Sequence, residues 1–460
     1  MNGGAIETVN PTTGEALARY PLASEKEIDS ALARATAAQR EWAARPLAER
    51  LERLARFADG FERKQNELAE LMTREMGKPI AQARAEAAKC ALAFRYYVEQ
   101  APRLLADEPV ATDAGKSAIV YQPLGTVFAI MPWNYPFWQV ARFAAPALAA
   151  GNAGILKHAP NATGCGLAFA ALAREADIPE GVFQTLVLDT DQAARVIADS
   201  RVAAVTLTGS ERAGRAVASV AGEHLKKCVL ELGGSDPFVV LADADLDRAA
   251  EVGVTARFQN NGQSCIAAKR FIVEAKVYEA FSKRFCERIK ALRLGDPMDE
   301  TTDIGPLARA DLRETLAAQV RASVEAGAQA LVGGKSVASA GFFYQPTLLA
   351  GVARGMPAAD EEIFGPVAAL MRAEDETEAL ALANATPYGL GACVWTQNRE
   401  RGERFARALD CGAAFVNGMV KSDPRLPFGG VKRSGYGREL AAAGLHEFLN
   451  VKTLWIAAEK

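Results

Sequence analysis

The chain has 460 residues, of which 50% are hydrophobic and 24% are charged, the balance of a soluble globular enzyme. Its 53 basic and 56 acidic residues leave a formal charge of −3, so the composition gives no case for binding nucleic acid or an anionic membrane surface. The length predicts about three domains and is ample to bury large cores.

The N-terminal sequence MNGGAIETVNPTTGE has no basic segment followed by an apolar core, so we expect no signal peptide. The most apolar helix-length stretch, residues 137–156, is interrupted by arginine, proline and glycine, which argues against a membrane span. Seven cysteines without a C-x-x-C pair indicate reduced thiols and a cytoplasmic protein. The three histidines show no ligand spacing, so no metal site is expected.

Residues 24–105 predict long helices, because apolar residues recur at spacings of three and four. Strand and helix patterns then alternate. Strands are expected at 126–131, 153–157, 183–188, 203–209, 228–234 and 237–241, and helices from about residues 161, 191 and 210. This alternation is typical of a parallel sheet covered by helices.

A second alternating set follows residue 265. It predicts strands at 270–274, 331–334, 368–372 and 393–396, and a helix at 277–292. We therefore expect two α/β domains that divide near residues 233–236. The segments 116–125 and 448–458 have the pattern of exposed edge strands, which often pair between subunits.

Seven short motifs occur in order along the chain. They are PWNYP (132–136), ILKHAP (155–160), TGS (208–210), LELGGSDP (230–237), GQSC (262–265), EEIFGPV (361–367) and PFGGVKRSGYGRE (427–439). Together they resemble the aldehyde dehydrogenase superfamily over essentially the whole chain. The segments KKCVLELGGSDPF and NNGQSC, with the AAKRF that follows, most resemble its succinate-semialdehyde dehydrogenase group.

The resemblance implies an α/β fold with a variant Rossmann coenzyme domain, a second α/β catalytic domain and a β-strand oligomerisation extension. The dinucleotide-binding domain would comprise residues 1–110 and 124–233, the catalytic domain 234–432, and the oligomerisation segments 111–123 and 433–460. It also implies a small aldehyde substrate and a homodimer or homotetramer, with no metal, nucleic acid or membrane as a partner.

The reaction of the family requires a nucleophile that later leaves. A thiol adds to the aldehyde, a hydride leaves for the coenzyme, and water hydrolyses the resulting thioester. Cys265 matches the nucleophile, Glu231 the base that activates water, and Asn134 the residue that stabilises the oxyanion. Each alone has a plainer interpretation, as a buried apolar thiol, a strand-end carboxylate and a turn asparagine. The surrounding motifs favour the catalytic roles.

The coenzyme site lacks a G-x-G-x-x-G fingerprint, as the family's variant Rossmann arrangement implies. Lys157 would meet the adenosine ribose or a 2′-phosphate, and Glu362 would hold the nicotinamide ribose. A helix that opens at the TGS motif would face the pyrophosphate with its N-terminal amides. The other positions matched to this site are Trp133, His158, Pro160, Gly209, Ser210 and Phe364.

One position departs from the NAD-selective pattern. Three residues after the lysine, many NAD-preferring relatives carry glutamate, whereas this chain has Pro160. No carboxylate is there to repel a 2′-phosphate, so the coenzyme is expected to be NAD or NADP, with the preference open. His158, beside Lys157, would add a weak cation.

The helix after PWNYP places Trp138 and Arg142 one turn apart on the same face. An arginine on such a helix is most often ion-paired within the protein. In the family, however, this helix lies beside the substrate tunnel, where a guanidinium can bind a carboxylate bidentately. Ser264 and Ser422 would add hydroxyl donors. These groups favour an ω-carboxy aldehyde such as succinate semialdehyde.

Other functions remain open at this point. Within the same class, the substrate would be glutarate semialdehyde or a broad range of aliphatic and aromatic aldehydes. A thiol hydrolase needs a histidine partner, and His158, His224 and His446 lie in no recognisable catalytic context. The joint presence of Cys265, Glu231, Asn134, Lys157 and Glu362 argues against a structural or binding protein that kept the fold but lost catalysis.

Overall fold

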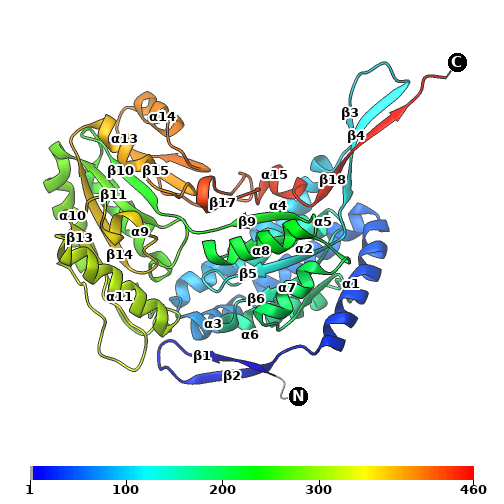
Figure 1. Cartoon of the computed structure of the whole chain (residues 1–460), viewed down its shortest axis with the longest axis horizontal. Coiled ribbons are helices and arrows are strands. Elements are labelled where there is room, and N and C mark those ends of the chain that lie inside the picture. The colour runs from blue at the N-terminus through cyan, green and yellow to red at the C-terminus, as the bar shows by residue number, and fades with distance from the viewer. Residues whose placement is uncertain (1–3, 460) are drawn as a thin grey trace.

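The computed structural model describes residues 4–459. Two α/β bodies lie side by side, and a narrow β extension projects from one of them near the C-terminus (Figure 1). None of the helices in residues 4–459 combines the length and the apolar character needed to cross a membrane.

The first body begins with a hairpin and four helices, which confirm the helices predicted for residues 24–105. They are β1 (Ala5–Val9), β2 (Ala16–Pro21), α1 (Glu25–Ala44), α2 (Leu47–Arg63), α3 (Gln65–Met76) and α4 (Ile80–Leu104). A capping box starts α1, because the Ser24 hydroxyl accepts from the Glu27 amide while the Glu27 carboxylate accepts from the Ser24 amide. Gly77, with φ of 77°, ends α3 in the left-handed conformation that favours glycine.

A six-stranded sheet forms the centre of this body, in the order β17-β9-β8-β5-β6-β7. Its strands are β5 (Thr126–Met131), β6 (Ala153–His158), β7 (Phe183–Thr185), β8 (Val202–Thr208), β9 (Lys227–Glu231) and the antiparallel β17 (Gly435–Tyr436). Its helices are α5 (Trp138–Ala149), η1 (Pro160–Ala162), α6 (Thr163–Glu175), α7 (Thr190–Ala198) and α8 (Glu211–Glu223).

The strand order places the ligand-binding edge of this sheet. The chain steps from β5 to β6 and β7 in one direction, then returns to β8 and β9 on the other side of β5. In such sheets, ligands bind beyond the carboxyl ends of the strands where the order reverses, here between β5 and β8. The PWNYP motif follows β5, and the TGS motif ends β8.

The second body holds a seven-stranded sheet in the order β12-β13-β14-β11-β10-β15-β16, parallel except for β12. Its strands are β10 (Asp236–Val240), β11 (Ala268–Glu274), β12 (Gln329–Val332), β13 (Thr347–Ala350), β14 (Val367–Ala373), β15 (Gly391–Trp395) and β16 (Ala413–Val416). Its helices are α9 (Leu246–Phe258), η2 (Gln259–Gly262), η3 (Ala275–Val277), α10 (Tyr278–Lys290), α11 (Ala310–Glu325), α12 (Pro357–Asp360), α13 (Glu376–Asn384), α14 (Arg399–Arg407) and η4 (Lys432–Ser434).

The chain crosses from the first sheet to the second between β9 and β10, at residues 232–235. The two α/β domains with parallel sheets predicted from the alternating pattern are therefore confirmed, and each sheet has one antiparallel edge strand. Two strands are shorter than expected, because the segment predicted as 183–188 leaves the edge of its sheet after Thr185 and the segment predicted as 228–234 ends at Glu231.

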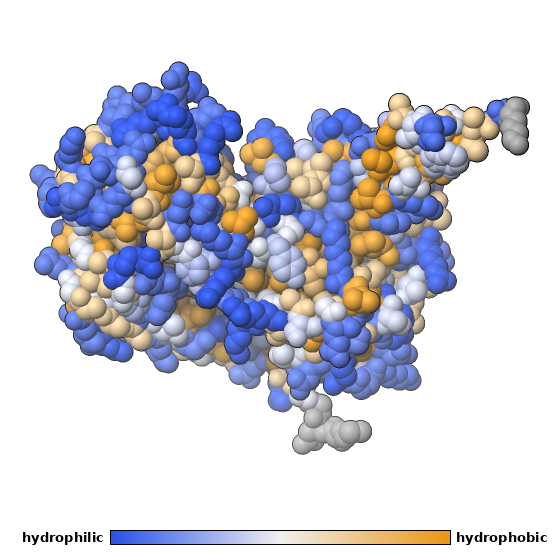
Figure 2. All heavy atoms as spheres, turned by 45° about the horizontal axis from the view of Figure 1, so that its top comes forward, coloured by the Kyte–Doolittle hydropathy of each residue, from blue (hydrophilic) through white to orange (hydrophobic). Residues whose placement is uncertain are grey.

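The projecting extension consists of β3 (Glu108–Pro109), β4 (Lys116–Pro123) and β18 (Leu449–Ile456), and α15 (Ala441–His446) precedes β18. The two segments expected as edge strands pair with each other, since β4 is antiparallel to β18 along its full length. Hydrophobic residues gather near the base of this extension (Figure 2). Residues 435–436, which the sequence grouped with the oligomerisation segments, instead add β17 to the six-stranded sheet.

Candidate active site

The segment that carries Cys265 has an unusual backbone. Asn260, Asn261 and Gly262 have φ values of 55°, 58° and 71°, three successive residues in the left-handed region. Asparagine tolerates this conformation better than other residues with a side chain, and glycine adopts it freely. The N-N-G sequence therefore permits the sharp path from α9 to the nucleophile and on to β11.

The two asparagine side chains fix this path. The amide nitrogen of Asn260 donates to the carbonyls of Asn134, at 2.8 Å, and Gln263, at 3.0 Å. The amide nitrogen of Asn261 donates to the carbonyl of Gly77 at 2.8 Å. The cysteine loop of the second body is thus bonded to the first body. Sequence reasoning assigned these asparagines no role, although N-N-G is a recognisable turn signal.

Cys265 lines a cavity of about 340 Å³. Burial raises the pKa of its thiol to about 12, while the charges of Arg142 and Lys269 oppose that rise. The neutral thiol is therefore the favoured form at neutral pH, and the nearby cations are the groups that promote the thiolate.

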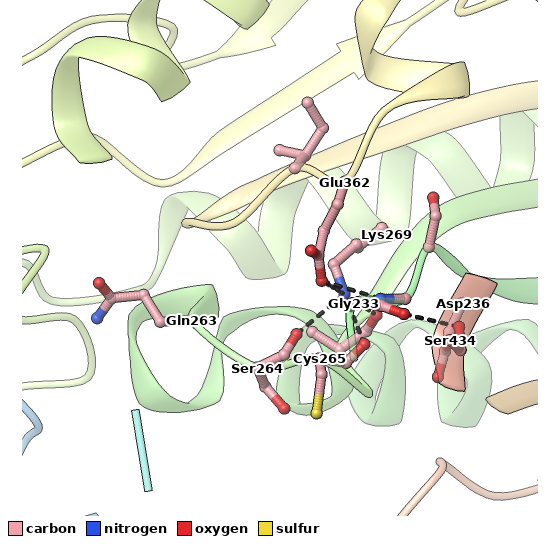
Figure 3. Close-up of polar contacts among 12 residues, drawn as sticks. Gly233, Asp236, Gln263, Ser264, Cys265, Lys269, Glu362 and Ser434 are labelled. Atoms are coloured by element: carbon pink, nitrogen blue, oxygen red, sulfur yellow. Dashed lines mark hydrogen bonds and ion pairs between the residues drawn. The ribbon is translucent and has the colours of Figure 1, made fainter. Parts of the chain in front are cut away.

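Lys269 ties the cysteine loop to a carboxylate of the predicted coenzyme site. Its ammonium donates to the carbonyls of Ser264, at 2.9 Å, and Cys265, at 2.8 Å, and lies 3.8 Å from Glu362 Oε1. Figure 3 shows Lys269 between Glu362 and the loop, while the sulfur of Cys265 points away from it. Sequence reasoning assigned Lys269 no role, although it lies in the AAKRF segment that follows the cysteine.

Asn134 lies next to the cysteine loop, as expected. Its side-chain amide nitrogen donates to the carbonyl of Gln263 at 3.0 Å, and its amide oxygen accepts from Gln139 at 3.1 Å. The side chain is buried and therefore held in one orientation. The second N–H of the same amide donates to no other residue in 4–459.

Glu231 ends β9 with its carboxyl group buried. Burial raises its pKa well above the ordinary range, the Glu439 carboxylate adds to the rise, and the Arg142 and Arg438 charges oppose it. Neither carboxyl oxygen makes a hydrogen bond with any residue in 4–459. A Cβ at Gly429 would lie 2.7 Å from Glu231 Oε1, so the glycine provides the space for this carboxyl.

The predicted nicotinamide end of the coenzyme site is assembled around Glu362. Its Oε1 accepts from the Gly234 amide at 3.0 Å. Burial raises the pKa of this carboxyl, and Lys269 opposes the rise. Trp133 and Phe364 meet edge to face, with their ring centres 5.8 Å apart. The structure thus brings Trp133 and Phe364, two of the residues matched to the coenzyme site, into contact.

The predicted adenosine end lies at the carboxyl edge of the same sheet. Ser210 is the N-cap of α8, and its hydroxyl accepts from the Ala213 amide at 3.3 Å. Gly209, just before it, donates its amide to the Glu231 carbonyl at 2.9 Å. Lys157 ends near this edge, forms no ion pair with a carboxylate of residues 4–459, and has its pKa lowered by burial. Pro160 is exposed at the start of η1.

His158 does not fit the predicted role of a coenzyme-binding cation. It is buried, its Nδ1 accepts from the Ala159 amide at 2.9 Å, and its Nε2 donates to the Pro136 carbonyl at 2.9 Å. Burial lowers the pKa of the ring to about 4. Both nitrogens are used internally and the ring is neutral, so His158 anchors the end of β6.

Trp138, Arg142, Ser264 and Ser422 all line the cavity at Cys265, as expected. The Ser422 hydroxyl accepts from Trp138 Nε1 at 3.1 Å. Arg142, however, is already paired, because its Nε lies 2.7 Å from Glu439 Oε2 and both side chains are 3% exposed. The expectation that its charge is free for a substrate carboxylate is therefore corrected, since Glu439 neutralises it.

The comparisons with known proteins agree with this geometry. Residues 1–454 match the aldehyde dehydrogenase family, and the chain belongs to it. A protein from Synechocystis sp. named probable succinate-semialdehyde dehydrogenase [NADP(+)] is 52% identical over 453 residues, which cover 98% of this chain and 100% of the relative.

Two solved structures are also similar. The succinic semialdehyde dehydrogenase from Streptococcus pyogenes, in complex with NADP+, has a TM-score of 0.96 at 37% identity, covering 98% of this chain and 100% of its own. An NAD-dependent aldehyde dehydrogenase from Sinorhizobium meliloti has a TM-score of 0.96 at 36% identity, covering 99% and 92%. The family and fold predicted from the motifs are confirmed.

Proposed function

We propose that this aldehyde dehydrogenase oxidises succinate semialdehyde to succinate and accepts NADP as well as NAD. The observation that carries the proposal is the cavity at Cys265, which is lined by cations and hydroxyl groups that suit a carboxylated aldehyde. The names of relatives at 50–52% identity support the same substrate and NADP.

In the proposed mechanism, the thiolate of Cys265 adds to the aldehyde carbon. A carbon–sulfur bond forms, and the electron pair of the carbonyl moves to oxygen. The Asn134 amide and the backbone N–H of Cys265 donate hydrogen bonds to that oxygen. Lys269 holds the loop through its carbonyls and favours the thiolate by its charge.

When bound, a nicotinamide coenzyme would supply the acceptor for the hydride that leaves the substrate carbon, and the substrate would then be held on Cys265 as an acyl thioester. Glu231 then takes a proton from a water molecule as the water oxygen attacks the thioester carbon. The carbon–sulfur bond breaks, the acid leaves, and Cys265 is regenerated. Burial beside Glu439 raises the proton affinity of Glu231, which suits a base.

The residues at the sheet edge fit a dinucleotide. We propose that Glu362 holds the nicotinamide ribose and that Trp133 and Phe364 pack beside it. The amides that follow Gly209 and Ser210, at the start of the 13-residue helix α8, would face the pyrophosphate. These assignments are supported by the position of Trp133, Gly209 and Ser210 just after β5 and β8, where the strand order reverses, and by the contacts of Phe364 with Trp133 and of Glu362 with the Gly234 amide.

Lys157 and Pro160 would define the ribose end of the adenosine. The Lys157 ammonium forms no ion pair with a described carboxylate, so it is available to a ribose hydroxyl or to a 2′-phosphate. Pro160 presents no negative charge to repel that phosphate. This supports the use of NADP, while the preferred coenzyme is a matter for measurement.

For the substrate, we propose contacts with Trp138, Ser264 and Ser422, which line the cavity at Cys265. Glutarate semialdehyde and uncharged aldehydes are the alternative substrates. Measuring kcat/KM for aldehydes of graded chain length, each with NAD and with NADP, would rank them.

We also propose a homodimer or homotetramer that is assembled through the β extension, and a cytoplasmic location, in keeping with seven free cysteines. The support for assembly is an exposed apolar strand: Val451 is 59% exposed and Trp455 is 52% exposed. The strand β18 also has one free edge.

The test of the function is Cys265→Ala. With succinate semialdehyde and NADP, the variant should lose oxidation entirely, because no other group is placed to form the thioester. Coenzyme affinity, measured by calorimetry, should stay close to that of wild type. A labelled acyl group trapped on another cysteine of the wild-type protein would contradict the assignment.

A further inference from the structure

The cavity at Cys265 contains a cation that no motif identifies. Lys89 lies on α4, and its ammonium donates to Ser422 Oγ at 2.8 Å and sits 4.2 Å from the centre of the Trp138 ring. We propose that Lys89, together with Ser422, binds the carboxylate of the substrate and sets the specificity for ω-carboxy aldehydes. The inference rests on the function proposed above.

The charges that line the cavity support this choice. Lys78 is buried and ion-paired with Glu86, and it lies 3.9 Å from the centre of the Tyr135 ring. Glu86 Oε1 also accepts from the backbone amides of Phe137, at 2.9 Å, and Trp138, at 3.0 Å. This pair is complete, so neither member offers a free charge to a substrate.

Arg142 is likewise compensated, by Glu439. Lys89, in contrast, forms no ion pair with a carboxylate anywhere in residues 4–459. Lys421 also lines the cavity but is exposed, where solvent weakens its attraction for an anion. Lys89 is therefore the uncompensated cation that lies within the cavity.

The hydrogen bonds of Ser422 leave two donors side by side, the Lys89 ammonium and the Ser422 hydroxyl. The Ser422 oxygen accepts from Lys89 Nζ and from Trp138 Nε1, which uses both of its lone pairs. Its own proton is left to donate. An ammonium and a hydroxyl that lie 2.8 Å apart at one cavity, each with a proton left to donate, form a receptor for a carboxylate, and the apolar ring of Trp138 lies beside them.

The surroundings of Lys89 also favour an anionic ligand. Burial, with a smaller contribution from the charge of Arg142, lowers the pKa of its ammonium to about 8, while Cys90, Glu86 and Asp423 oppose this shift. The ammonium is still mostly protonated at pH 7. A carboxylate bound against it stabilises the charged form, so binding and protonation favour each other.

The test compares Lys89→Met and Lys89→Arg with wild type on two aldehydes. With succinate semialdehyde, Lys89→Met should raise KM about 10- to 100-fold with kcat little changed, because a hydrogen bond to a charged group is lost. With butanal, which has no carboxylate, KM should stay the same or fall. Lys89→Arg should restore part of the loss. Lys421→Met is the matched control and should have a much smaller effect.

The pH dependence gives a second readout. The ratio of kcat/KM for succinate semialdehyde to that for butanal cancels the titration of Cys265 and Glu231, since both substrates need these groups. In wild type the ratio should fall as the pH rises above about 8, because the ammonium form of Lys89 is lost. In Lys89→Met it should be flat. If Lys89→Met lowers kcat/KM equally for both aldehydes, or if its ratio depends on pH as in wild type, Lys89 only supports the structure.

Calorimetry separates this inference from the proposed function. Succinate should bind wild type and fail to bind Lys89→Met, whereas butyramide should not distinguish the two proteins. That result would support the receptor even if the enzyme oxidised no succinate semialdehyde. Normal oxidation of succinate semialdehyde by Lys89→Met would overturn the receptor and leave the proposed function standing. Binding of succinate equally to both proteins, or to neither, would have the same meaning.

Discussion

The carboxyl group of Glu231 is buried close to that of Glu439, and Arg142 is the cation near both. Burial is the largest cause of the raised pKa of each carboxyl. A carboxylate with raised proton affinity is a stronger base than an exposed one, and a general base works best when its pKa lies near the operating pH. Burial of the Glu231 carboxyl therefore lowers the stability of the fold but raises the basicity that the proposed deacylation needs.

Glu231→Gln tests this role. The variant should still form the thioester but hydrolyse it slowly, because the glutamine amide cannot accept the proton from water. Rapid mixing should show a burst of reduced coenzyme and then a steady rate about 10²- to 10⁴-fold lower than that of wild type. If the burst disappears together with the steady rate, Glu231 acts before hydride transfer, for example on the thiol.

Pro160 offers a test of coenzyme choice at a single residue. Pro160→Glu should raise KM for NADP about 10- to 100-fold, because a carboxylate would face the 2′-phosphate, and should change KM for NAD much less. Pro160→Gln is the matched uncharged control and should leave the ratio of the two values nearly unchanged. An equal loss with both coenzymes would place residue 160 away from the 2′ position.

At the scale of elements, the sequence predicted most of what local patterns determine. The strands β5, β6, β8, β10 and β11 and the long N-terminal helices follow from apolar periodicity, and the motifs located Cys265, Glu231 and Asn134 at one site. The hairpin of β1 and β2 was not predicted, because its exposed residues show no buried pattern.

Pairs between distant segments were the part that sequence reasoning could not supply. His158 and Arg142 were both assigned ligand roles, yet each is bonded inside the protein, to Pro136 and to Glu439. Lys89 lies on a helix with no motif and meets Ser422 only in the fold. Whether a cation is free depends on its neighbours in space, which local spacing does not specify.

The anchoring of α5 can be tested through Arg142→Leu. Removing one partner of a buried ion pair leaves Glu439 uncompensated, so we expect a destabilisation of about 3–5 kcal/mol, seen as a lower Tm. The rates of oxidation of succinate semialdehyde and butanal should fall together, because the charge of Arg142 also acts on Glu231, which both substrates need. Adding Glu439→Gln should recover much of the Tm. A loss confined to succinate semialdehyde at unchanged Tm would return Arg142 to the role of substrate receptor.

At the scale of the whole molecule, the site is formed where the two α/β bodies meet. The first body supplies Asn134 and Glu231, and the second supplies Cys265 and Glu362. The Asn260 and Asn261 side chains bond one body to the other next to the nucleophile. Changes in how the bodies pack would therefore alter the geometry of the thiol, its base and the coenzyme site at once.

The β extension stands apart from this site, and its exposed face is where we expect subunits to meet. Val451 and Trp455 are four residues apart on β18, so they share one face of the strand, and both are more than half exposed. The double variant Val451→Lys/Trp455→Lys places two charges on that face.

Light scattering of wild type should give a multiple of the 49.0 kDa chain mass, and the variant should give a smaller species with the same circular dichroism. Leu225→Lys, at a residue 96% exposed on another surface, is the control and should keep the wild-type mass. An unchanged mass in the double variant would mean that the subunits associate elsewhere.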